Sequence, residues 1–242
     1  MKARYTLIAA LGLVAIANRP AAAQDDFKKF AAWAAMMSTP YGSLPPVVTS
    51  AMAGSTQGRT GNTFELRYGH WSFGEESDAI NIGGIGGRFG RLGLVFGYEG
   101  CHDCDGNLIG GIDYDAPILS QMLTGNGASS LFTVGMRPAL GIGRTTGGGD
   151  GATSFSGTVD VPFAVSVPVG RTARMVPFIS PGAGFGSVRS GNESETGTRA
   201  SLAFGAGVVD LAPGLALNLS WRKIFLEGAP TTIGLGLTLG GR

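Results

Sequence analysis

Apolar and polar residues alternate along most of this chain with a period of two. In "TTIGLGLTLGG", Ile233, Leu235, Leu237 and Leu239 share one face, whereas glycine and threonine occupy the other. "LALNLSWRKIF" and "SFSGTVDVPFAVSV" show the same alternation. Successive side chains of a strand point to opposite faces, whereas a helix repeats about every 3.6 residues. The pattern therefore predicts β-structure.

Turn residues divide this pattern into about ten strands, with eight as the alternative count. The expected strands span residues 62–74, 79–88, 91–100, 107–118, 131–144, 154–168, 174–187, 198–210, 215–226 and 231–241. Tight turns such as "RFGR", "VGRT" and "LAPG" alternate with longer polar loops such as "TTGGGDGATS" and "SGNESETG". Bacterial outer-membrane barrels have short periplasmic turns and longer outer loops.

Two all-β architectures fit this alternation, a soluble β-sandwich and a membrane barrel. Charged residues make up 14% of the chain, below the roughly 25% of ordinary soluble domains. The less apolar strand faces carry Gly, Ser and Thr with isolated charges. Because every backbone group must be paired in hydrocarbon, a membrane sheet has to close. The sequence favours an all-β fold, a closed antiparallel up-and-down transmembrane β-barrel formed by residues 61–242.

The first 23 residues have the pattern of a secretory signal peptide. Lys2 and Arg4 precede an apolar run, and Ala21, Ala22 and Ala23 provide a small-residue cleavage site. The apolar run is shorter than the ~20 residues of a transmembrane helix. We expect cleavage after Ala23 and export to the cell outer membrane.

Residues 24–60 are expected to form a periplasmic helix and linker. "DDFKKFAAWAAMM" has apolar residues near helical spacing, and Pro40, Pro45 and Pro46 then end the helix. The helix either lies on the inner membrane–water interface, which we favour, or enters the barrel mouth as a plug. Since the segment carries no alternating strand, we expect the barrel to form without it.

Without the signal peptide, the chain has 15 basic and 17 acidic residues, which offers no basic face for a nucleic acid. Unpaired buried charge is costly, so charges inside the barrel should form an ion-pair network. Barrels of about 8 strands are filled by side chains, whereas open channels need roughly 16. A ten-strand lumen should therefore be mostly filled, with a solute pathway as the alternative. The alternation places nine charged residues in the lumen: Glu65, Arg67, Glu99, Asp113, Asp115, Arg137, Asp160, Arg199 and Arg222.

Cys101 and Cys104 lie in "GYEGCHDCDG", between the third and fourth expected strands. Cysteines of exported proteins usually pair, so we expect a disulfide that pins this loop. With His102 as the one nearby histidine, a structural zinc site would lack ligands, because such sites usually have four. A free or intermolecular thiol pair and a metal site stay open as alternatives. We expect no metal and no cofactor.

In this pattern, residues 61–242 resemble small outer-membrane β-barrel domain proteins of Gram-negative bacteria. The resemblance implies contact with outer-membrane lipid and lipopolysaccharide, and insertion by the barrel-assembly machinery. Such barrels commonly end in an aromatic residue that assists assembly, whereas this chain ends in Arg242. The resemblance identifies no surface ligand.

A further resemblance concerns His70-Trp71-Ser72 in the first expected strand. Outer-membrane lipid A deacylases use a His-x-Ser pair on a barrel strand plus a Glu, and related palmitoyltransferases carry an N-terminal helix, as residues 26–37 would. The deacylase pair lies near the end of its chain, however, and Trp71 and Tyr68 fit an interfacial aromatic girdle better. We therefore expect a structural or surface-interaction role and no enzyme activity. A narrow channel for small or apolar solutes is the alternative, and a lipid A-modifying enzyme comes third.

Overall fold

The computed structural model describes residues 39–44, 46, 48, 52, 62–72, 80–100, 106–125, 128–146, 151–191, 193–225 and 231–240. Its one helix in these ranges is α3 (Pro40–Ser43). None of the described helices is long and apolar enough to cross a membrane. The strands are β1 (Thr63–Ser72), β2 (Ile80–Phe89), β3 (Leu92–Gly100), β4 (Asn107–Tyr114), β5 (Ala116–Gly125), β6 (Ala128–Thr145), β7 (Thr153–Asp160), β8 (Phe163–Val169), β9 (Ala173–Ser190), β10 (Glu193–Ala212), β11 (Leu215–Ile224) and β12 (Thr231–Gly240).

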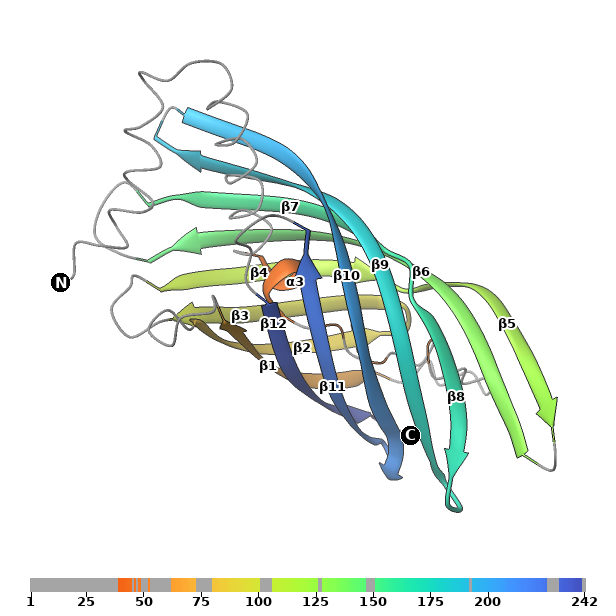
Figure 1. Ribbon diagram of the computed structural model, residues 1–242. Coiled ribbons are helices and arrows are strands. Elements are labelled where there is room, and N and C mark those ends of the chain that lie inside the picture. Colours follow the sequence, from red (N-terminus) through yellow and green to blue (C-terminus); the bar gives the residue numbers. More distant parts are fainter. Residues whose placement is uncertain are drawn as a thin grey trace.

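Ten of these strands close into an antiparallel barrel (Figure 1). Around the ring they follow the order β1, β2, β3, β4, β6, β7, β9, β10, β11, β12. The ring closes where β1 pairs with β12, from Thr63 opposite Gly240 to Ser72 opposite Thr231. The expected closed up-and-down β-barrel is confirmed, with ten strands in the ring.

The other two strands, β5 and β8, extend strands of the ring beyond its wall (Figure 1). β5 continues β4 along β6 in the same register, because Asp113 lies opposite Ala139 and Ala116 lies opposite Met136. β8 continues β7 between β6 and β9 in the same way. The expected strand 107–118 is therefore interrupted at Asp115 and extends to Gly125. The expected strand 154–168 is interrupted only at residues 161–162.

The predicted tight turns are present after β2, β8 and β10. Gly90, Gly170 and Gly214 occupy them with φ angles of 62°, 72° and 79°. This left-handed conformation is strained for residues with a Cβ, so glycine allows the chain to reverse within a few residues.

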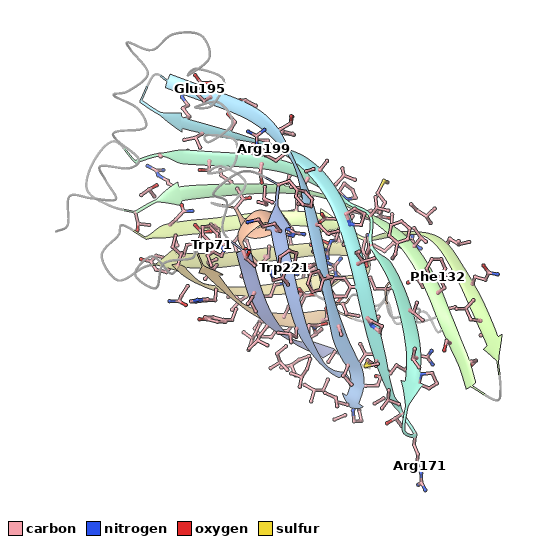
Figure 2. The ribbon with its side chains drawn as sticks, viewed as in Figure 1. Trp71, Phe132, Arg171, Glu195, Arg199 and Trp221 are labelled. Carbon is pink, nitrogen blue, oxygen red and sulfur yellow. The ribbon has the colours of Figure 1, made fainter. Side chains whose placement is uncertain are left out.

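The connection between β9 and β10 differs from the expected long polar loop. β9 runs to Ser190 and β10 begins at Glu193, so most of "SGNESETG" is part of an extended hairpin. Its polar side chains support the pairing, since Thr196 Oγ1 donates a hydrogen bond to Ser187 Oγ at 2.9 Å. Figure 2 shows Glu195 of this hairpin and Arg171 of the β8–β9 turn at opposite ends of the molecule.

The outer face of the ring is apolar, and the inner face carries the charges. On the outer face Phe204 and Trp221 stack with ring centroids 4.6 Å apart. A barrel in a bilayer presents such an apolar band to lipid. Outward side chains that are at least 40% exposed include Phe64, Leu66, Ile85, Phe96, Leu108, Ile112, Leu140, Ile142, Phe155, Val159, Ile179, Phe204, Leu217, Leu219, Ile233, Leu235 and Leu239.

Candidate functional site

The first charge cluster of the lumen joins β1, β2 and β4. Glu65 and Arg67 lie two residues apart on β1, so both point inward, and Arg67 Nε donates to Glu65 Oε2 at 3.0 Å. Arg88 of β2 lies between two carboxylates. Its Nη2 donates to Asp113 Oδ1 at 2.6 Å, and its Nε lies 3.7 Å from Glu65 Oε1. All four side chains are buried.

The second charge cluster lies around Asp160 at the end of β7. Arg222 of β11 donates from Nη2 to Asp160 Oδ2 at 2.8 Å, and Arg137 of β6 places its Nη2 at 3.8 Å from the same oxygen. The three residues are buried and come from three different strands. Two guanidinium groups therefore share one carboxylate, which compensates charges that would be costly if unpaired.

Tyr41 of α3 connects the two clusters inside the barrel. Its hydroxyl donates to Asp113 Oδ2 at 3.2 Å, and its carbonyl oxygen accepts a hydrogen bond from Arg222 Nη1. Burial, and next the nearby Asp113 carboxylate, raise the pKa of the Tyr41 phenol well above its ordinary range. The phenol therefore stays protonated and remains a donor.

The described residues between 39 and 52, here called the lumen segment, run inside the barrel. Thr39 Oγ1 and Ser156 Oγ are 2.6 Å apart. The backbone N–H of Val48 donates to Asn218 Oδ1 at 2.9 Å, and the carbonyl oxygen of Met52 accepts from Thr133 Oγ1 at 3.1 Å. The expected periplasmic linker therefore lies inside the barrel at these positions, whereas entry into the barrel mouth had been kept as the alternative placement of the helix. The expected helix at 26–37 lies outside the described residues.

Inward glycines make room for the lumen segment. A Cβ at Gly84 would lie 2.6 Å from Leu44 Cδ1, and a Cβ at Gly111 would lie 2.5 Å from Tyr41 Cε2. Side chains at these wall positions would occupy the space that Tyr41 and Leu44 fill. The glycine-rich inner face thus allows the backbone of the wall to approach the lumen segment closely.

Two apolar clusters pack around the lumen segment. The first contains Tyr41, Leu44, Trp71, Ile82, Val95, Ile109, Ala139 and Ile224. The second contains Val48, Met52, Ala164, Val176 and Phe178. Trp71 is therefore buried inside the barrel at 4% exposure, and the prediction that it belongs to an interfacial girdle is wrong. Tyr68, which faces outward and is 43% exposed, is compatible with such a girdle.

Glu99, Asp115 and Arg199 were also predicted for the lumen, and none of them belongs to the two charge clusters. Glu99 is buried and accepts a hydrogen bond from Asn107 Nδ2 at 2.8 Å. Asp115 is buried where β4 passes into β5. Arg199 is half-buried and donates from Nη1 to the Thr198 carbonyl oxygen at 2.5 Å, outside both charge clusters. Arg88, which was not among the nine predicted residues, joins Glu65 to Asp113.

Arg88 is the last residue of the expected strand 79–88 and the first of the tight turn "RFGR", and it was not included in the predicted lumen set. The structure extends β2 to Phe89, so Arg88 keeps the inward alternation of Ile82, Gly84 and Gly86. That alternation was visible within the expected strand, and following it from Gly86 to the last residue places Arg88 in the lumen.

His70 lies on the outer face of β1, away from the charged lumen. Its Nδ1 is 3.1 Å from Asn81 Oδ1, which also accepts a hydrogen bond from the Tyr68 hydroxyl at 2.6 Å. The side chain of Ser72, like Cys101 and Cys104, lies outside the described residues. The described part of the chain contains no group of three or more His, Cys, Asp or Glu side chains that could hold a metal ion.

The closed ring, the apolar outer belt and the charged interior define a β-barrel of the outer-membrane class. No protein-family model matches the chain, and no curated protein matches it. Among solved structures, it is similar to Ail, the attachment invasion locus protein of Yersinia pestis, with 14% identity over 74% of this chain and 97% of that one, and a TM-score of 0.34.

Two further solved structures show a similar likeness. The outer membrane enzyme PagL has 13% identity over 72% of this chain and 98% of its own, with a TM-score of 0.35. The β domain of the Bordetella autotransporter BrkA has 13% identity over 75% of this chain and 99% of its own, with a TM-score of 0.38. At such identities the likeness concerns the fold alone.

Proposed function

We propose that this protein is a barrel of the cell outer membrane with a structural or surface-interaction role and a lumen closed by its own residues. The observation that carries the proposal is the position of Tyr41, which hydrogen-bonds both lumen charge clusters from within the barrel. A side chain in this place obstructs the lumen between β4 and β11. Leu44 and Trp71 pack beside it in one apolar cluster.

The outer face supports the membrane part of the proposal. Leu219 and Leu235 are both 56% exposed, and Phe96 is 60% exposed. Water would disfavour so large an apolar surface, whereas lipid accepts it. Closure of the ring also leaves the strands around the barrel without an unpaired edge, as a bilayer requires.

The β9–β10 hairpin supports the surface-interaction part of the proposal. It extends away from the end of the barrel that carries the three tight turns, and it presents Ser187, Arg189, Ser194 and Glu195. In the outer-membrane class the short turns face the periplasm and the longer connections face the exterior. The hairpin is then the element available to an external partner.

Planar-bilayer recording tests the closed lumen. We expect the wild-type protein to give no conductance steps, and a variant lacking residues 39–52 to give them once it shows the heat-modifiable gel migration of a folded barrel. N-terminal sequencing of protein from isolated outer membranes should begin at Gln24. Wild-type conductance, or recovery of the protein from the soluble fraction, would contradict the proposal.

A narrow channel for small solutes is the second candidate, and one observation favours it. Among the buried polar atoms without a hydrogen-bond partner in the described residues are hydroxyl and amide groups of β7, β9 and β11: Thr158 Oγ1, Ser180 Oγ, Asn218 Nδ2 and Ser220 Oγ. Buried polar groups of this kind are usually satisfied by ordered water. A hydrated strip along β7, β9 and β11 would give the wild-type protein small conductance steps, which separates this candidate from the closed barrel.

A further inference from the structure

Two arginines flank one threonine on the outer face of the barrel, at the end away from the tight turns. Thr153 of β7 lies opposite Arg144 of β6 on one side and opposite Arg189 of β9 on the other. The three residues, here called the arginine row, therefore lie side by side on neighbouring strands. Neighbouring strands are about 4.8 Å apart, so the backbones of the two arginines are separated by about 10 Å.

The side chains of the arginine row point away from the lumen. Arg144 continues the outward alternation of Leu140 and Ile142 on β6. On β9, Arg189 lies on the same face as the outward Phe185. Both arginines are exposed, and neither takes part in an ion pair among the described residues. Two positive charges on one face repel each other, and an anion bound between them would replace this repulsion with attraction.

Apolar surface begins directly beneath the arginine row. Phe155 is the next outward residue of β7, and its ring centroid lies 5.8 Å from that of Phe185 on β9. The Phe185 ring also covers Gly157, where an added Cβ would collide with it. An apolar groove follows, and its lining includes Leu140, Gly157, Ala183 and Phe185. The outer face thus places two cations, which the described residues leave without a counter-charge, above a groove that suits the apolar part of an anionic amphiphile.

We propose that the arginine row binds a phosphate group of lipopolysaccharide and that the groove beneath it holds an acyl chain of the same molecule. Guanidinium groups bind phosphate through paired hydrogen bonds, and the Thr153 hydroxyl lies between them as a further donor. Short turns of the outer-membrane class face the periplasm, so the arginine row lies at the external surface, where this lipid is found. The inference rests on the membrane part of the proposed function and names the lipid that this face selects.

The combination of charge and groove distinguishes this lipid from other anions. Free phosphate would bind the arginines but leave the groove empty, whereas an uncharged lipid would fill the groove but leave the arginines without a counter-charge. The lipid A part of lipopolysaccharide carries phosphate groups and acyl chains on the same pair of sugars. Basic side chains at a membrane surface attract anionic head groups, and buried acyl chains add affinity in proportion to their length.

Titration with diphosphoryl lipid A, followed by native mass spectrometry from detergent, tests the arginine row in the purified protein. Arg144→Gln/Arg189→Gln removes both charges and should weaken binding by about tenfold or more. Arg91→Gln/Arg171→Gln is the matched control, because it removes two exposed arginines from the turns at the other end of the barrel, where Figure 2 shows Arg171. This control should bind lipid A like the wild type. Equal affinity of the two double variants would overturn the proposal.

Further probes test whether charge and groove act together. Lipid A without phosphate groups should bind the wild type about as weakly as diphosphoryl lipid A binds Arg144→Gln/Arg189→Gln. Ala183→Trp fills the groove without changing the charge, so it should weaken the binding of lipid A but not that of inorganic phosphate. If inorganic phosphate binds as tightly as lipid A, or if Ala183→Trp has no effect, the arginines attract any anion and the proposal is wrong.

Heat-modifiable gel migration separates a failed site from a failed barrel. Each variant must show this shift and be recovered with the outer membrane before its affinity is compared with that of the wild type. A folded wild-type barrel that binds lipid A equally well with and without phosphate groups would overturn this inference but leave the proposed function in place. A wild-type protein without the shift would contradict the proposed function itself, and this inference with it.

Discussion

The Tyr41 hydroxyl donates a hydrogen bond to Asp113 Oδ2 at 3.2 Å, although the two residues are 72 positions apart in the chain. Tyr41 precedes the barrel in sequence, and Asp113 belongs to its wall. The contact therefore joins the lumen segment to the charge cluster of β1, β2 and β4. Its strength should determine how firmly the segment is held.

Tyr41→Phe should lower the free energy of unfolding by about 1–3 kcal/mol, because a buried carboxylate oxygen loses a hydrogen-bond donor. Guanidinium unfolding in detergent measures the difference. Tyr68→Phe is the matched control, since it also removes a phenol hydrogen bond, the one to Asn81, but on the exposed outer face. If Tyr41→Phe lowers the free energy of unfolding no more than Tyr68→Phe does, the hydrogen bond between Tyr41 and Asp113 stabilises the barrel no more than an exposed one.

Arg88→Ala should destabilise the barrel by about 3–5 kcal/mol, because removing one partner leaves Glu65 and Asp113 as undercompensated buried charges. Arg91→Ala removes an exposed arginine from the following turn and should change stability by no more than about 0.5 kcal/mol. The midpoint of guanidinium-induced unfolding is compared for the two variants, with the same dependence of the unfolding free energy on guanidinium concentration in both. Equal midpoints would mean that the carboxylates find other partners.

The alternation of apolar and polar residues was sufficient to predict the ring and most of its interior. The two faces of a strand between lipid and a narrow lumen have different surroundings. The apolar or polar character of each residue therefore indicates which of the two its side chain faces. Of the nine charges assigned to the lumen, eight are buried, and the ninth, Arg199, is half-buried. The two interruptions at residues 115 and 161–162 leave the register intact, so neither changes which side chains face inward.

The lumen segment could not be derived from that alternation. Its contacts join residues far apart in the chain, as Val48 and Asn218 do, and it has no strand period of its own. Trp71 was misassigned because an apolar aromatic suits lipid and an apolar plug equally well. Its position in β1, on the same face as Glu65 and Arg67, was the available indication that it points inward.

His70→Ala should leave the lipid A of an expressing Gram-negative strain unchanged, and so should the wild-type protein. His70 contacts Asn81, and among the described residues no acidic side chain forms an ion pair with it. A histidine base needs such an orienting partner to activate a serine. Mass spectrometry of lipid A checks this expectation. A loss of one acyl chain with the wild type, reversed by His70→Ala, would show that the protein is a deacylase.

Cys101 and Cys104 should be oxidised to each other in the exported protein, although both lie outside the described residues. The connection between β3 and β4 is expected in an oxidising compartment, where paired cysteines persist. Maleimide labelling of the denatured protein should modify neither thiol without reductant and both after reduction. Labelling of both thiols without reductant would rule out the disulfide.

Neighbouring glycines of β2 offer the sharpest test of the lumen segment. Gly84 points inward, and a Cβ there would lie 2.6 Å from Leu44 Cδ1. At Gly83, which points outward, a Cβ would meet nothing within 4 Å. Gly84→Val should therefore displace Leu44 and cost about 1–3 kcal/mol, the usual effect of overpacking. Gly83→Val should be neutral or slightly stabilising, because a β-branched residue suits a strand.

Limited proteolysis shows whether Gly84→Val acts through the lumen segment. Displacement of Leu44 should make residues 39–52 more susceptible to cleavage in the folded barrel, with no such change for Gly83→Val. If Gly84→Val lowers stability but leaves the cleavage of this segment unchanged, the strain lies in the β2 wall itself. Leu44 would then not occupy the space in front of Gly84.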